Sequence, residues 1–563
     1  MRIQRVCQGV SLGVFLGLLT LATYPLVEGL PVDLLLRMDP VVALGTVVAE
    51  RAWVLAFLPA LIVLLVSAVA GRVFCGHVCP MGTTLDILQS QVPRKEKPSA
   101  KNNAFPATAA YRSLKYLLLA VIVGAAVLGV SLVHVGSPIS LVTRFYGIAV
   151  YPLLLMAGDW GLFQASPIFS GLGLHGLALT ELTQKVFSTN LLVSALFVGI
   201  ALLAWVQPRF WCRNLCPAGG LMALLSRMPL IRRTVDDSCT RCGRCAKACP
   251  TGAIEDDPHR TAHQECIVCL KCEELCPESA ISFSRPRSEI GTPVGKIDLT
   301  RRSVMFAAGS GIVTGGLLRT SLLQPRPLGK EPMLRSEDLV RAPGSVPEPL
   351  FLSRCIRCGE CMKACPTNTL QPTWLKAGLE GIFSPVMVPR LAACAVNCNV
   401  CGKVCPTGAI RDVGLVEKRH AKVGTAWIVH QNCLAWEQDK KCLVCDEVCP
   451  YDAVEFRPVP GKRNGVPFVL AHKCVGCGWC ECKCPVTGAA AIRVNIIGEI
   501  RIETGSYVEK AKEYGMIFQV RDKPKEQLAP ETFDFHGATP EPPPQSPAPQ
   551  PKKPEVPPGF ITD

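Results

Sequence analysis

The sequence predicts a multidomain protein in which an α-helical membrane bundle is joined to two cysteine-rich α+β domains. The chain has 563 residues, which is too long for one ordinary domain. Long apolar runs fill its first 207 positions, whereas the second half is mostly polar. The mean hydropathy is +0.29 and only 18% of the residues are charged, so part of the chain is expected inside a membrane. Thirty cysteines, most of them in one repeated spacing, define the other domains.

Four apolar segments are long enough to cross a bilayer as helices, which takes about 20 residues each. They are Val6–Val27, Ala52–Ala70, Tyr116–Val135 and Leu191–Val206. None of them carries the polar face of a helix that covers a soluble core. Two further apolar stretches, Val41–Ala49 and Ile139–Ala157, are interrupted and are interpreted as interfacial or re-entrant pieces. Residues 1–233 are therefore the predicted membrane domain.

Basic residues set the predicted orientation, because short cytoplasmic loops are rich in Lys and Arg. One side of the bundle would carry Arg2, Arg5, Arg72, Arg94, Lys95, Lys97, Lys101, Arg112, Lys115, Arg209, Arg213, Arg227, Arg232 and Arg233. The other side would carry only Arg37, Arg51, Arg144 and Lys185. The N-terminus and the chain from residue 209 onward are then cytoplasmic, in a multi-pass protein of the bacterial inner membrane. We interpret the net charge of +14 as this topology signal, and we expect no nucleic-acid partner because no nucleic-acid module is found.

The first cysteine-rich domain, residues 234–286, contains "CTRCGRCAKACP" and "CIVCLKCEELCP". This C-x2-C-x2-C-x3-C-P spacing is the signature of bacterial ferredoxins, in which the fourth cysteine of one motif ligates the cluster of the other. One [4Fe–4S] cluster is thus predicted on Cys239, Cys242, Cys245 and Cys276. The second is predicted on Cys266, Cys269, Cys272 and Cys249. We expect a cytoplasmic α+β two-cluster domain.

The second cysteine-rich domain, residues 351–500, has four motifs that each end in Cys-Pro. Its sixteen predicted ligands are Cys355, Cys358, Cys361, Cys365, Cys394, Cys398, Cys401, Cys405, Cys433, Cys442, Cys445, Cys449, Cys474, Cys477, Cys480 and Cys484. They imply four more clusters, about six in all, and either a nested or a sequential pairing of the motifs fits the spacing. Disulfides and zinc are the alternatives, but neither requires cysteines at every third residue with a proline after the fourth.

Six cysteines remain outside these motifs. Cys75, Cys79, Cys212 and Cys216 form two matching sequences, "CGHVCP" and "CRNLCP", each just beyond a predicted span. These C-x3-C-P motifs hold a further cluster, act as a dithiol pair or contact quinone, and their catalytic role stays open. Cys7 and Cys482 are interpreted as spare thiols.

His77 and His134 are candidates for taking a quinol proton, although packing is the commoner role of such histidines. Arg144 meets a quinone headgroup or anchors at the interface.

A twin-arginine-like signal is predicted in the middle of the chain, at residues 298–323. The sequence "TRRSVM" is followed by an apolar core, Val304–Leu318, of only 15 Gly-rich residues. No cleavage-site pattern follows, so this segment is expected to stay as a fifth, anchoring helix. It would place the second cysteine-rich domain in the periplasm, after a linker at 324–350. Residues 501–563 are Pro-rich at their end and are predicted to be a disordered tail.

Residues 1 to about 286, with "FCGHVCPMG", "WCRNLCPAGG" and the two-cluster domain, resemble NapH, the membrane quinol dehydrogenase subunit of periplasmic nitrate reductase systems. Residues from about 298 to 500, with "TRRSVM", "GIFSPVMVPRLAAC" and "CLAW", resemble NapG and its methylamine-utilisation relative MauM. The chain looks like a NapH–NapG fusion, related to MauN and MauM. The resemblance implies a quinol dehydrogenase that draws on the membrane quinone pool and passes electrons to a periplasmic c-type cytochrome or terminal reductase.

Two other functions remain open at this point. Four-span proteins with C-x3-C-P motifs, similar to NosR and to the cbb3-oxidase assembly protein CcoG, support the maturation of copper enzymes, so an assembly or regulatory factor is the alternative. A passive polyferredoxin subunit without a quinone site of its own is the third interpretation. Quinol-dependent cluster reduction separates the first interpretation from the third.

Overall fold

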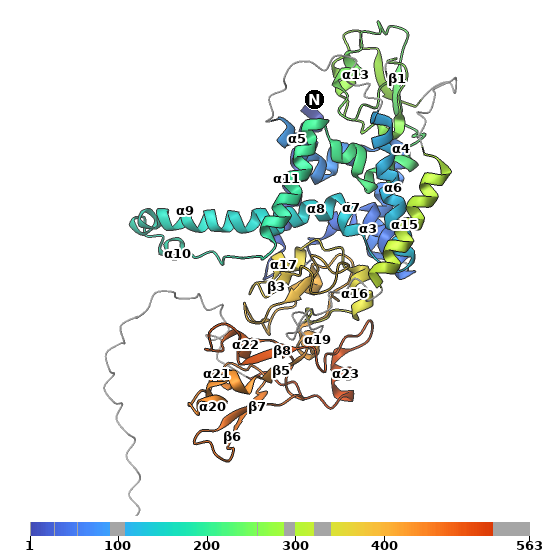
Figure 1. Cartoon of the computed structure of the whole chain (residues 1–563). Coiled ribbons are helices and arrows are strands. Elements are labelled where there is room, and N and C mark those ends of the chain that lie inside the picture. The colour runs from blue at the N-terminus through green and yellow to red at the C-terminus, as the bar shows by residue number, and fades with distance from the viewer. Residues whose placement is uncertain are drawn as a thin grey trace, which may run out of the picture. The chain divides into compact units, whose positions relative to one another are not determined.

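The computed structural model describes residues 2–27, 29–52, 55–90, 107–255, 257–285, 299–319 and 339–521 (Figure 1). All of these residues belong to one unit, Met1–Arg521. We name three of its parts by residue number: the helical part (2–233), the first cysteine block (234–285) and the second cysteine block (339–521). Helix α15 (Arg301–Arg319) comes between the two blocks in the chain.

The helical part is built from long apolar helices joined by short ones. The long helices are α1 (Arg2–Leu21), α4 (Leu58–Ala70), α6 (Ala107–Val127), α9 (Tyr151–Gly171) and α11 (Asn190–Val206). The short ones are α2 (Leu34–Arg37), α3 (Pro40–Glu50), η1 (Leu55–Phe57), η2 (Phe74–Val78), α5 (Pro80–Ser90), α7 (Val133–Gly136), α8 (Pro138–Arg144), η4 (Phe145–Val150), α10 (His175–Ala178), η5 (Trp211–Leu215) and α12 (Pro217–Leu225). Asp39 and Ser137 cap α3 and α8, each followed by a proline in the first helical position.

Two helices of the described chain are long and apolar enough to cross a membrane, Ile3–Leu21 and Pro138–Gly171. Of the four expected spans, only the first is one of these two candidates, and its helix ends at Leu21 and not at Val27. The fourth expected span matches α11, one of the shorter apolar helices. The second begins with the 3₁₀ turn η1, and the third ends at Val127 because Gly129 turns the chain with a positive φ of 76°. The stretch expected to be interrupted, Ile139–Ala157, instead lies inside the second candidate span. A π-helical turn, η4, carries the helix through it, and α9 then projects beside α10 (Figure 1).

Helix α15 packs along α6 through small residues (Figure 1). A Cβ atom on Gly311 would lie 2.3 Å from the carbonyl oxygen of Val121, and one on Gly124 would lie 2.4 Å from that of Ala308. Gly315, four residues after Gly311, faces Ala125 in the same way. This small-xxx-small spacing is the pattern by which helices approach closely in membranes. The Gly-rich run predicted as part of a signal is therefore also a packing face.

The first cysteine block has the small α+β form expected of it. Strands β1 (Arg232–Val235) and β2 (Ile281–Ser284) pair antiparallel, with Arg232 opposite Ser284. Between them lie α13 (Arg244–Ala248), η6 (His263–Glu265) and α14 (Lys271–Glu274). Cys245, Ile254, Cys272 and Ile281 form its small buried core.

The second cysteine block contains three antiparallel strand pairs. They are β3 (Leu370–Pro372) with β4 (Pro385–Met387), β5 (Thr425–Ile428) with β8 (Ile492–Asn495), and β6 (Val454–Arg457) with β7 (Val466–Val469). Its helices are α16 (Glu348–Arg354), α17 (Glu360–Ala364), α18 (Val400–Lys403), α19 (Leu415–His420), α20 (Leu434–Glu437), α21 (Val444–Glu447), α22 (Trp479–Cys482) and α23 (Tyr507–Glu513), with the 3₁₀ turn η9 (His430–Asn432).

This block is longer at both ends than the predicted 351–500. Val340, Ala342 and Val346, expected in the linker, are buried in its core. Residues 501–521, expected in the disordered tail, include α23, whose Tyr507 is fully buried. The expectation failed because this segment is apolar enough to pack: the backbone N–H of Tyr507 donates to the Glu417 carboxylate, and Phe518 joins the same core. The Pro-rich part at 522–563 and most of the linker lie outside the described residues.

Candidate iron–sulfur sites

In the first cysteine block, eight cysteines surround two hollows. Cys239, Cys242, Cys245 and Cys276 line one of about 310 Å³. Cys249, Cys266, Cys269 and Cys272 line the other, of about 350 Å³. Each hollow takes three thiols from one motif and the fourth from the other, which is the grouping that the ferredoxin spacing predicts.

In the second cysteine block, the structure selects the sequential pairing of motifs. The first motif shares a hollow of about 350 Å³ with the second, which contributes Cys405 to Cys355, Cys358 and Cys361. The electrostatic neighbours of Cys398 and Cys401 are Cys394 and Cys365, so these four thiols form the reciprocal group. Two further groups pair the third and fourth motifs: Cys474, Cys477, Cys480 with Cys449, and Cys433, Cys442, Cys445 with Cys484.

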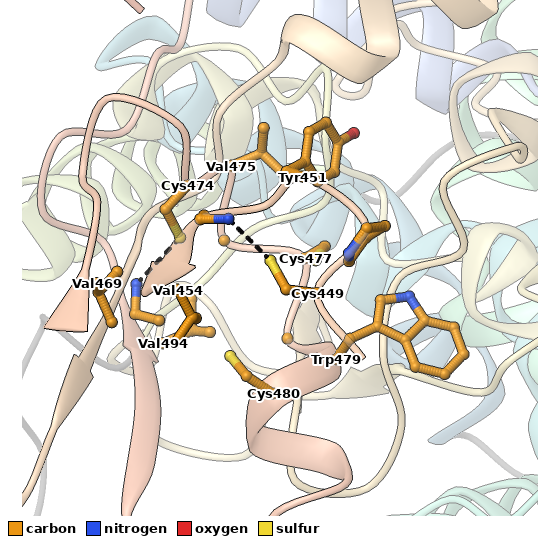
Figure 2. Close-up of a pocket in the computed structure, with 15 residues that line it drawn as sticks. Cys449, Tyr451, Val454, Val469, Cys474, Val475, Cys477, Trp479, Cys480 and Val494 are labelled. Carbon is orange, nitrogen blue, oxygen red and sulfur yellow. Dashed lines mark hydrogen bonds between the residues drawn. The ribbon is translucent and has the colours of Figure 1, made fainter. Parts of the chain in front are cut away.

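Backbone N–H groups point at the sulfur atoms of these sites, as Figure 2 shows for one hollow. The N–H of Ala453 donates to Cys449 Sγ at 3.3 Å, and that of Ala426 donates to Cys474 Sγ at 3.4 Å. Ala253 donates in the same way to Cys249 Sγ at 3.3 Å. Hydrogen bonds of this kind stabilise a thiolate and tune the cluster it holds. The residues present therefore fit [4Fe–4S] clusters.

The arrangement of the thiols also distinguishes a cluster from a single ion. Among the described residues, no three His, Cys, Asp or Glu side chains converge closely enough to hold one metal ion, as a zinc site requires. The thiols instead stand around hollows that an iron–sulfur core would fill. Of the 24 ferredoxin-type cysteines only Cys242 is exposed, so the remaining ligand positions are at least partly shielded from solvent.

The two C-x3-C-P motifs lie together in the helical part. Cys75, Cys79, Cys212 and Cys216 are each 9% exposed or less, and they share one apolar core with Cys269 of the first block and Cys358 of the second. Burial raises the pKa of the Cys79 thiol, and it raises that of Cys212 to about 11. The thiols of Cys79 and Cys212 are therefore neutral at pH 7 unless a bound group draws off their protons.

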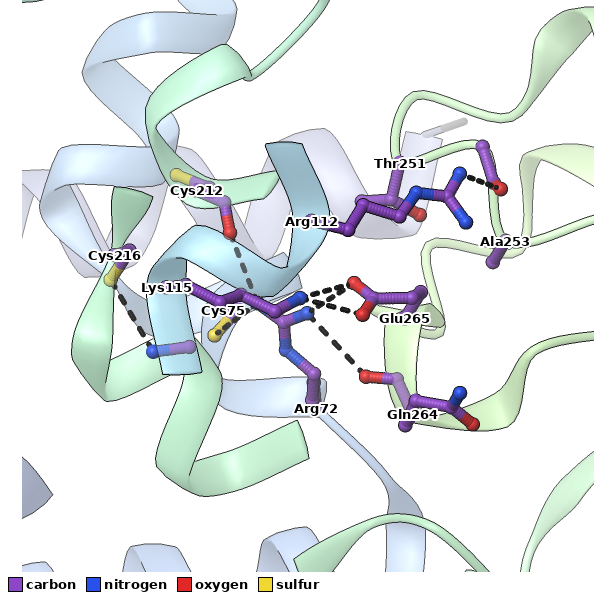
Figure 3. Close-up of polar contacts among 12 residues, drawn as sticks. Arg72, Cys75, Arg112, Lys115, Cys212, Cys216, Thr251, Ala253, Gln264 and Glu265 are labelled. Carbon is purple, nitrogen blue, oxygen red and sulfur yellow. Dashed lines mark hydrogen bonds and ion pairs between the residues drawn. The ribbon is translucent and has the colours of Figure 1, made fainter. Parts of the chain in front are cut away.

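Two ion-pair networks flank these thiols, and Figure 3 shows the one around Glu265. Glu265 binds Lys115 at 2.6 Å and Arg72 at 3.3 Å. On the other motif, Arg209 binds Asp86 at 2.6 Å. Burial alone would raise the pKa of Glu265, but Lys115 and Arg72 hold it below its ordinary value, and Arg209 does the same for Asp86. Both carboxylates are thus ionised, which keeps the buried cations paired.

Two of the candidate quinone residues meet the second cysteine block. Arg144 donates through Nε to the carbonyl of Arg357 at 2.9 Å and through Nη2 to that of His134 at 3.0 Å. Arg357 lies between Cys355 and Cys358, and its Nη1 is 2.6 Å from Nδ1 of His134. His77, by contrast, stays on η2, where burial lowers its pKa and Nδ1 faces only the carbonyl of Val73. The structure therefore brings His134 and Arg144 together and leaves His77 apart.

Further buried cations join the helical part to the second cysteine block. Lys363 donates to backbone carbonyls of Leu19 and Ala22, and Lys185 donates to the carbonyl of Cys365 at 2.9 Å. Neither Lys363 nor Arg357 was singled out from the sequence, and Lys185 was named there only as a basic residue that helps set the orientation. The sequence shows that Arg357 and Lys363 lie inside the motif "CIRCGECMKACP". Charged residues inside such a motif are ordinarily exposed, so this position alone did not indicate that they are buried. Of the two cysteines interpreted as spare thiols, Cys7 is exposed and Cys482 is partly buried.

Segments of the chain match families of iron–sulfur domains. A 4Fe-4S binding domain family matches residues 52–98 and 189–235, which contain one C-x3-C-P motif each. Two 4Fe-4S dicluster domain families match residues 231–277 and 354–409. The second of these ranges holds the first two motifs of the second block, in agreement with their pairing in the structure.

Relatives extend the match. The methylamine utilization ferredoxin-type protein MauM of Methylorubrum extorquens is 40% identical over 161 residues, which are 28% of this chain and 71% of that protein. The ferredoxin-type protein NapG of Escherichia coli is 35% identical over 176 residues, 30% of this chain and 75% of that protein. NapF of Escherichia coli is 32% identical over 159 residues, 27% of this chain and 84% of that protein.

The fold and these matches define a ferredoxin-type iron–sulfur electron-transfer protein with several 4Fe–4S domains. The chain belongs to the family of the ferredoxin-type proteins MauM and NapG.

Proposed function

We propose that this protein is bound to the bacterial inner membrane, oxidises quinol there and passes the electrons to a periplasmic c-type cytochrome or terminal reductase. The observation that carries the proposal is the contact of His134 and Arg144 with Arg357. It joins the helices to the loop of the first cluster motif of the second block. Bound clusters would supply one-electron transfer; the chain's residues hold them and position the quinol.

Membrane binding is supported by apolar side chains that the structure leaves uncovered. Leu65 on α4 is 59% exposed, and Phe163 on α9 is 74% exposed. Trp205, near the end of α11, is 68% exposed, where an aromatic ring suits the membrane interface. Exposed apolar surface of this extent marks contact with lipid or with a partner. In the proposed topology α1, α4, α6 and α11 span the membrane with α15 as a retained fifth span, so that the first block would lie in the cytoplasm and the second in the periplasm.

The proposed quinol site depends on the proton arrangement of His134. A guanidinium can only donate, so Nδ1 of His134 must accept from Arg357 and the ring proton sits on Nε2. His134 then offers a donor to a quinone oxygen instead of a base to a quinol hydroxyl. Arg144 fixes this geometry by binding the carbonyl of His134. We assign His134 to positioning the headgroup; quinol oxidation releases two electrons and two protons beside it.

Continuous packing supports an electron route from this site to the second block. The C-x3-C-P thiols share their core with Cys269 and Cys358. Further along, the N–H of Cys394 donates to the carbonyl of Cys477 at 2.9 Å, joining the motif pairs. The loops that carry the cysteines of one site therefore pack against those of the next. Electron transfer between clusters held by the protein needs this kind of close placement.

The alternative, an assembly factor for a copper enzyme, would need thiols that an incoming ion can reach. Cys75 is 9% exposed and Cys216 is 4% exposed, so the thiols of the helical part do not offer that access. We therefore favour electron supply over metal delivery.

The test is reduction of the iron–sulfur signal by a quinol in membranes that carry the full chain. We expect the wild-type signal to be reduced and His134→Gln to slow this at least about tenfold, equivalent to about 1.4 kcal/mol of activation free energy. His472→Gln, an exposed histidine of the second block, is the control and should behave as wild type. An unreduced wild-type signal, with dithionite still reducing it, would identify a passive polyferredoxin subunit instead.

A further inference from the structure

A longer motif than C-x3-C-P repeats in the helical part. The sequence R-x2-C-x3-C-P-x-G occurs at 72–82 and again at 209–219. In both copies a single π-helical turn, η2 or η5, carries the first cysteine, and a helix, α5 or α12, begins at the proline after the second. π-Helical turns of this kind often mark functional positions. Two segments with the same local structure are thus brought to one place.

The arginine of each copy reaches across to the other copy, as Figure 3 shows for Arg72 and Cys212. Nη2 of Arg72 lies 3.3 Å from the carbonyl oxygen of Cys212, and Nη1 of Arg209 lies 3.0 Å from that of Cys75. The glycine of each motif makes room for this crossing: a Cβ on Gly219 would lie 2.6 Å from Nη2 of Arg72. The exchange is reciprocal, so the two motifs close around one shared space.

The four thiols belong to one buried apolar core. Cys216 has Cys212, Cys75 and Cys79 as its electrostatic neighbours, and Arg72 Nη2 lies 4.0 Å from Cys75 Sγ. The N–H of Gly219, in the first turn of α12, donates to Cys216 Sγ at 3.3 Å. This matches the N–H to sulfur bonds at the fourth cysteines of the ferredoxin sites, such as Ala253 to Cys249. A thiolate at a helix N-terminus is favoured by the helix dipole as well.

The buried charges around the thiols do not cancel. Arg72, Lys115 and Arg209 are 1% exposed or less, and among the described residues they form ion pairs with two carboxylates, Glu265 and Asp86. Arg213, inside the second motif, is also buried. The buried cations outnumber the carboxylates that pair with them, and an unpaired buried charge is costly. Four thiolates around a [4Fe–4S]²⁺ core carry a net charge of about −2, which is the sign that this enclosure accommodates.

We propose that Cys75, Cys79, Cys212 and Cys216 together hold one further iron–sulfur cluster, and that Arg72 and Arg209 are positioning residues that close this site. A mononuclear ion fits less well, since no three ligating side chains of the described chain converge on one point. A disulfide within the site is absent too, because all described cysteines are free. The cluster's place as a middle centre rests on the proposed electron-transfer function, but its existence does not.

The test is metal and sulfide analysis of the purified full-length protein in detergent, handled without oxygen. Cys79→Ser/Cys216→Ser removes one thiol of each motif and should lose about two or about four iron atoms per chain with equal sulfide, while the ferredoxin-type signals stay. The control, Cys7→Ser/Cys482→Ser, should lose none. Unchanged iron in the double variant, or loss of zinc or copper instead, would overturn the proposal. This experiment measures iron and sulfide and does not measure quinol oxidation. Its result therefore stands even if the protein does not oxidise quinol.

Two variants keep the proposal testable if the double variant does not accumulate. Cys79→Ser alone keeps an oxygen ligand, so we expect unchanged iron with a shifted electron paramagnetic resonance signal. Arg72→Gln should shift the same signal and its midpoint potential, and Arg72→Lys should restore part of the shift by returning the charge. An identical spectrum in Cys79→Ser would refute ligation by Cys79, and an identical spectrum in Arg72→Gln would remove Arg72 from the site.

Discussion

Nη1 of Arg357 lies 2.6 Å from Nδ1 of His134, so a residue inside a cluster motif of the second block is hydrogen-bonded to a turn of the helical part. The same nitrogen donates to the carbonyl of Ser131 at 2.7 Å. Arg357 is 1% exposed, and this contact leaves no room for solvent between the two parts. The second block is thereby fixed to the helices that we propose lie in the membrane.

Arg357→Lys should loosen this attachment, because one ammonium cannot reproduce the planar fork in which Nη1 binds Ser131 and His134 while Nη2 donates to the carbonyl of Glu380. We expect the free energy of unfolding to fall by about 1–3 kcal/mol, as for a buried carbonyl left without its donor. Hydrogen–deuterium exchange should rise in residues 131–144. Arg463→Lys, on an exposed loop, is the control. Exchange that is unchanged at 131–144 would show that the contact does not hold the two parts together.

Packing of α15 on α6 gives a second prediction. Gly311→Leu would place a side chain against the Val121 carbonyl, where a Cβ alone comes within 2.3 Å, and overpacking of this kind costs about 1–3 kcal/mol. Gly309→Leu is the matched control, because nothing lies within 4 Å of a Cβ at that position. Thermal unfolding in detergent should separate the two variants. Equal melting temperatures would mean that α15 does not pack on α6.

The end of the second block can be located by truncation. A chain that stops after Arg521 should keep the stability of the full protein. One that stops after Ile500 loses α23 with Tyr507, Ala511 and Phe518, and burial of one large aromatic residue alone is worth about 3–5 kcal/mol. Urea unfolding followed by loss of the cluster absorbance measures both. Equal urea midpoints for the two truncated chains would show that residues 501–521 do not contribute to the stability of the second block.

Acid should weaken one ion-pair network of this block. Glu348 binds Arg341 at 2.6 Å and Arg501 at 2.7 Å. Burial opposes its charge, but these guanidinium groups hold the pKa of Glu348 below its ordinary value. The resulting stability is fully present above the unfolded pKa of about 4.3 and is lost as the pH falls through the lower folded value.

Glu348→Gln should therefore be less stable than wild type at pH 7, and the difference should shrink as the pH falls below about 4, because Glu348 becomes protonated in that range. Urea midpoints of the two proteins at several pH values give this difference, with the exposed Glu509→Gln as control. A difference that stays constant down to the lowest pH would mean that the charge of Glu348 contributes nothing.

The sequence predicted the sites better than it predicted the helices. Cysteine spacing fixes which thiols share a turn, so the grouping of Cys239, Cys242, Cys245 and Cys276 could be stated in advance. Pairing in the second block could not, because either order satisfies the spacing, and only packing of the loops selects one. Arg72 and Arg209 were counted as surface charges of a cytoplasmic face, yet they are buried between the two C-x3-C-P motifs. Each of them lies three residues before the first cysteine of its motif. This repeated spacing could have indicated a role at the C-x3-C-P site.

The predicted ends of the second cysteine block and of the helices were wrong for a different reason. Proline-rich composition predicts the absence of a core, but it describes an average over 501–563 and hides the apolar residues at its beginning, such as Tyr507 and Phe518. Hydropathy likewise located the apolar segments without giving helix lengths. Gly129 ends α6 and a π-helical turn continues the helix after α8, and both are local backbone events that an average over a window does not resolve.

The central claim is that quinol oxidised beside His134 reduces the second cysteine block, and that the C-x3-C-P thiols, which share an apolar core with Cys358, take part in this transfer. The most direct measurement is quinol-driven reduction of the second block's iron–sulfur signals in membranes that contain wild type or Cys75→Ser/Cys212→Ser. We predict reduction in wild type and none in the variant, while dithionite reduces the second block in both. Undiminished quinol-driven reduction in the folded variant would contradict the account.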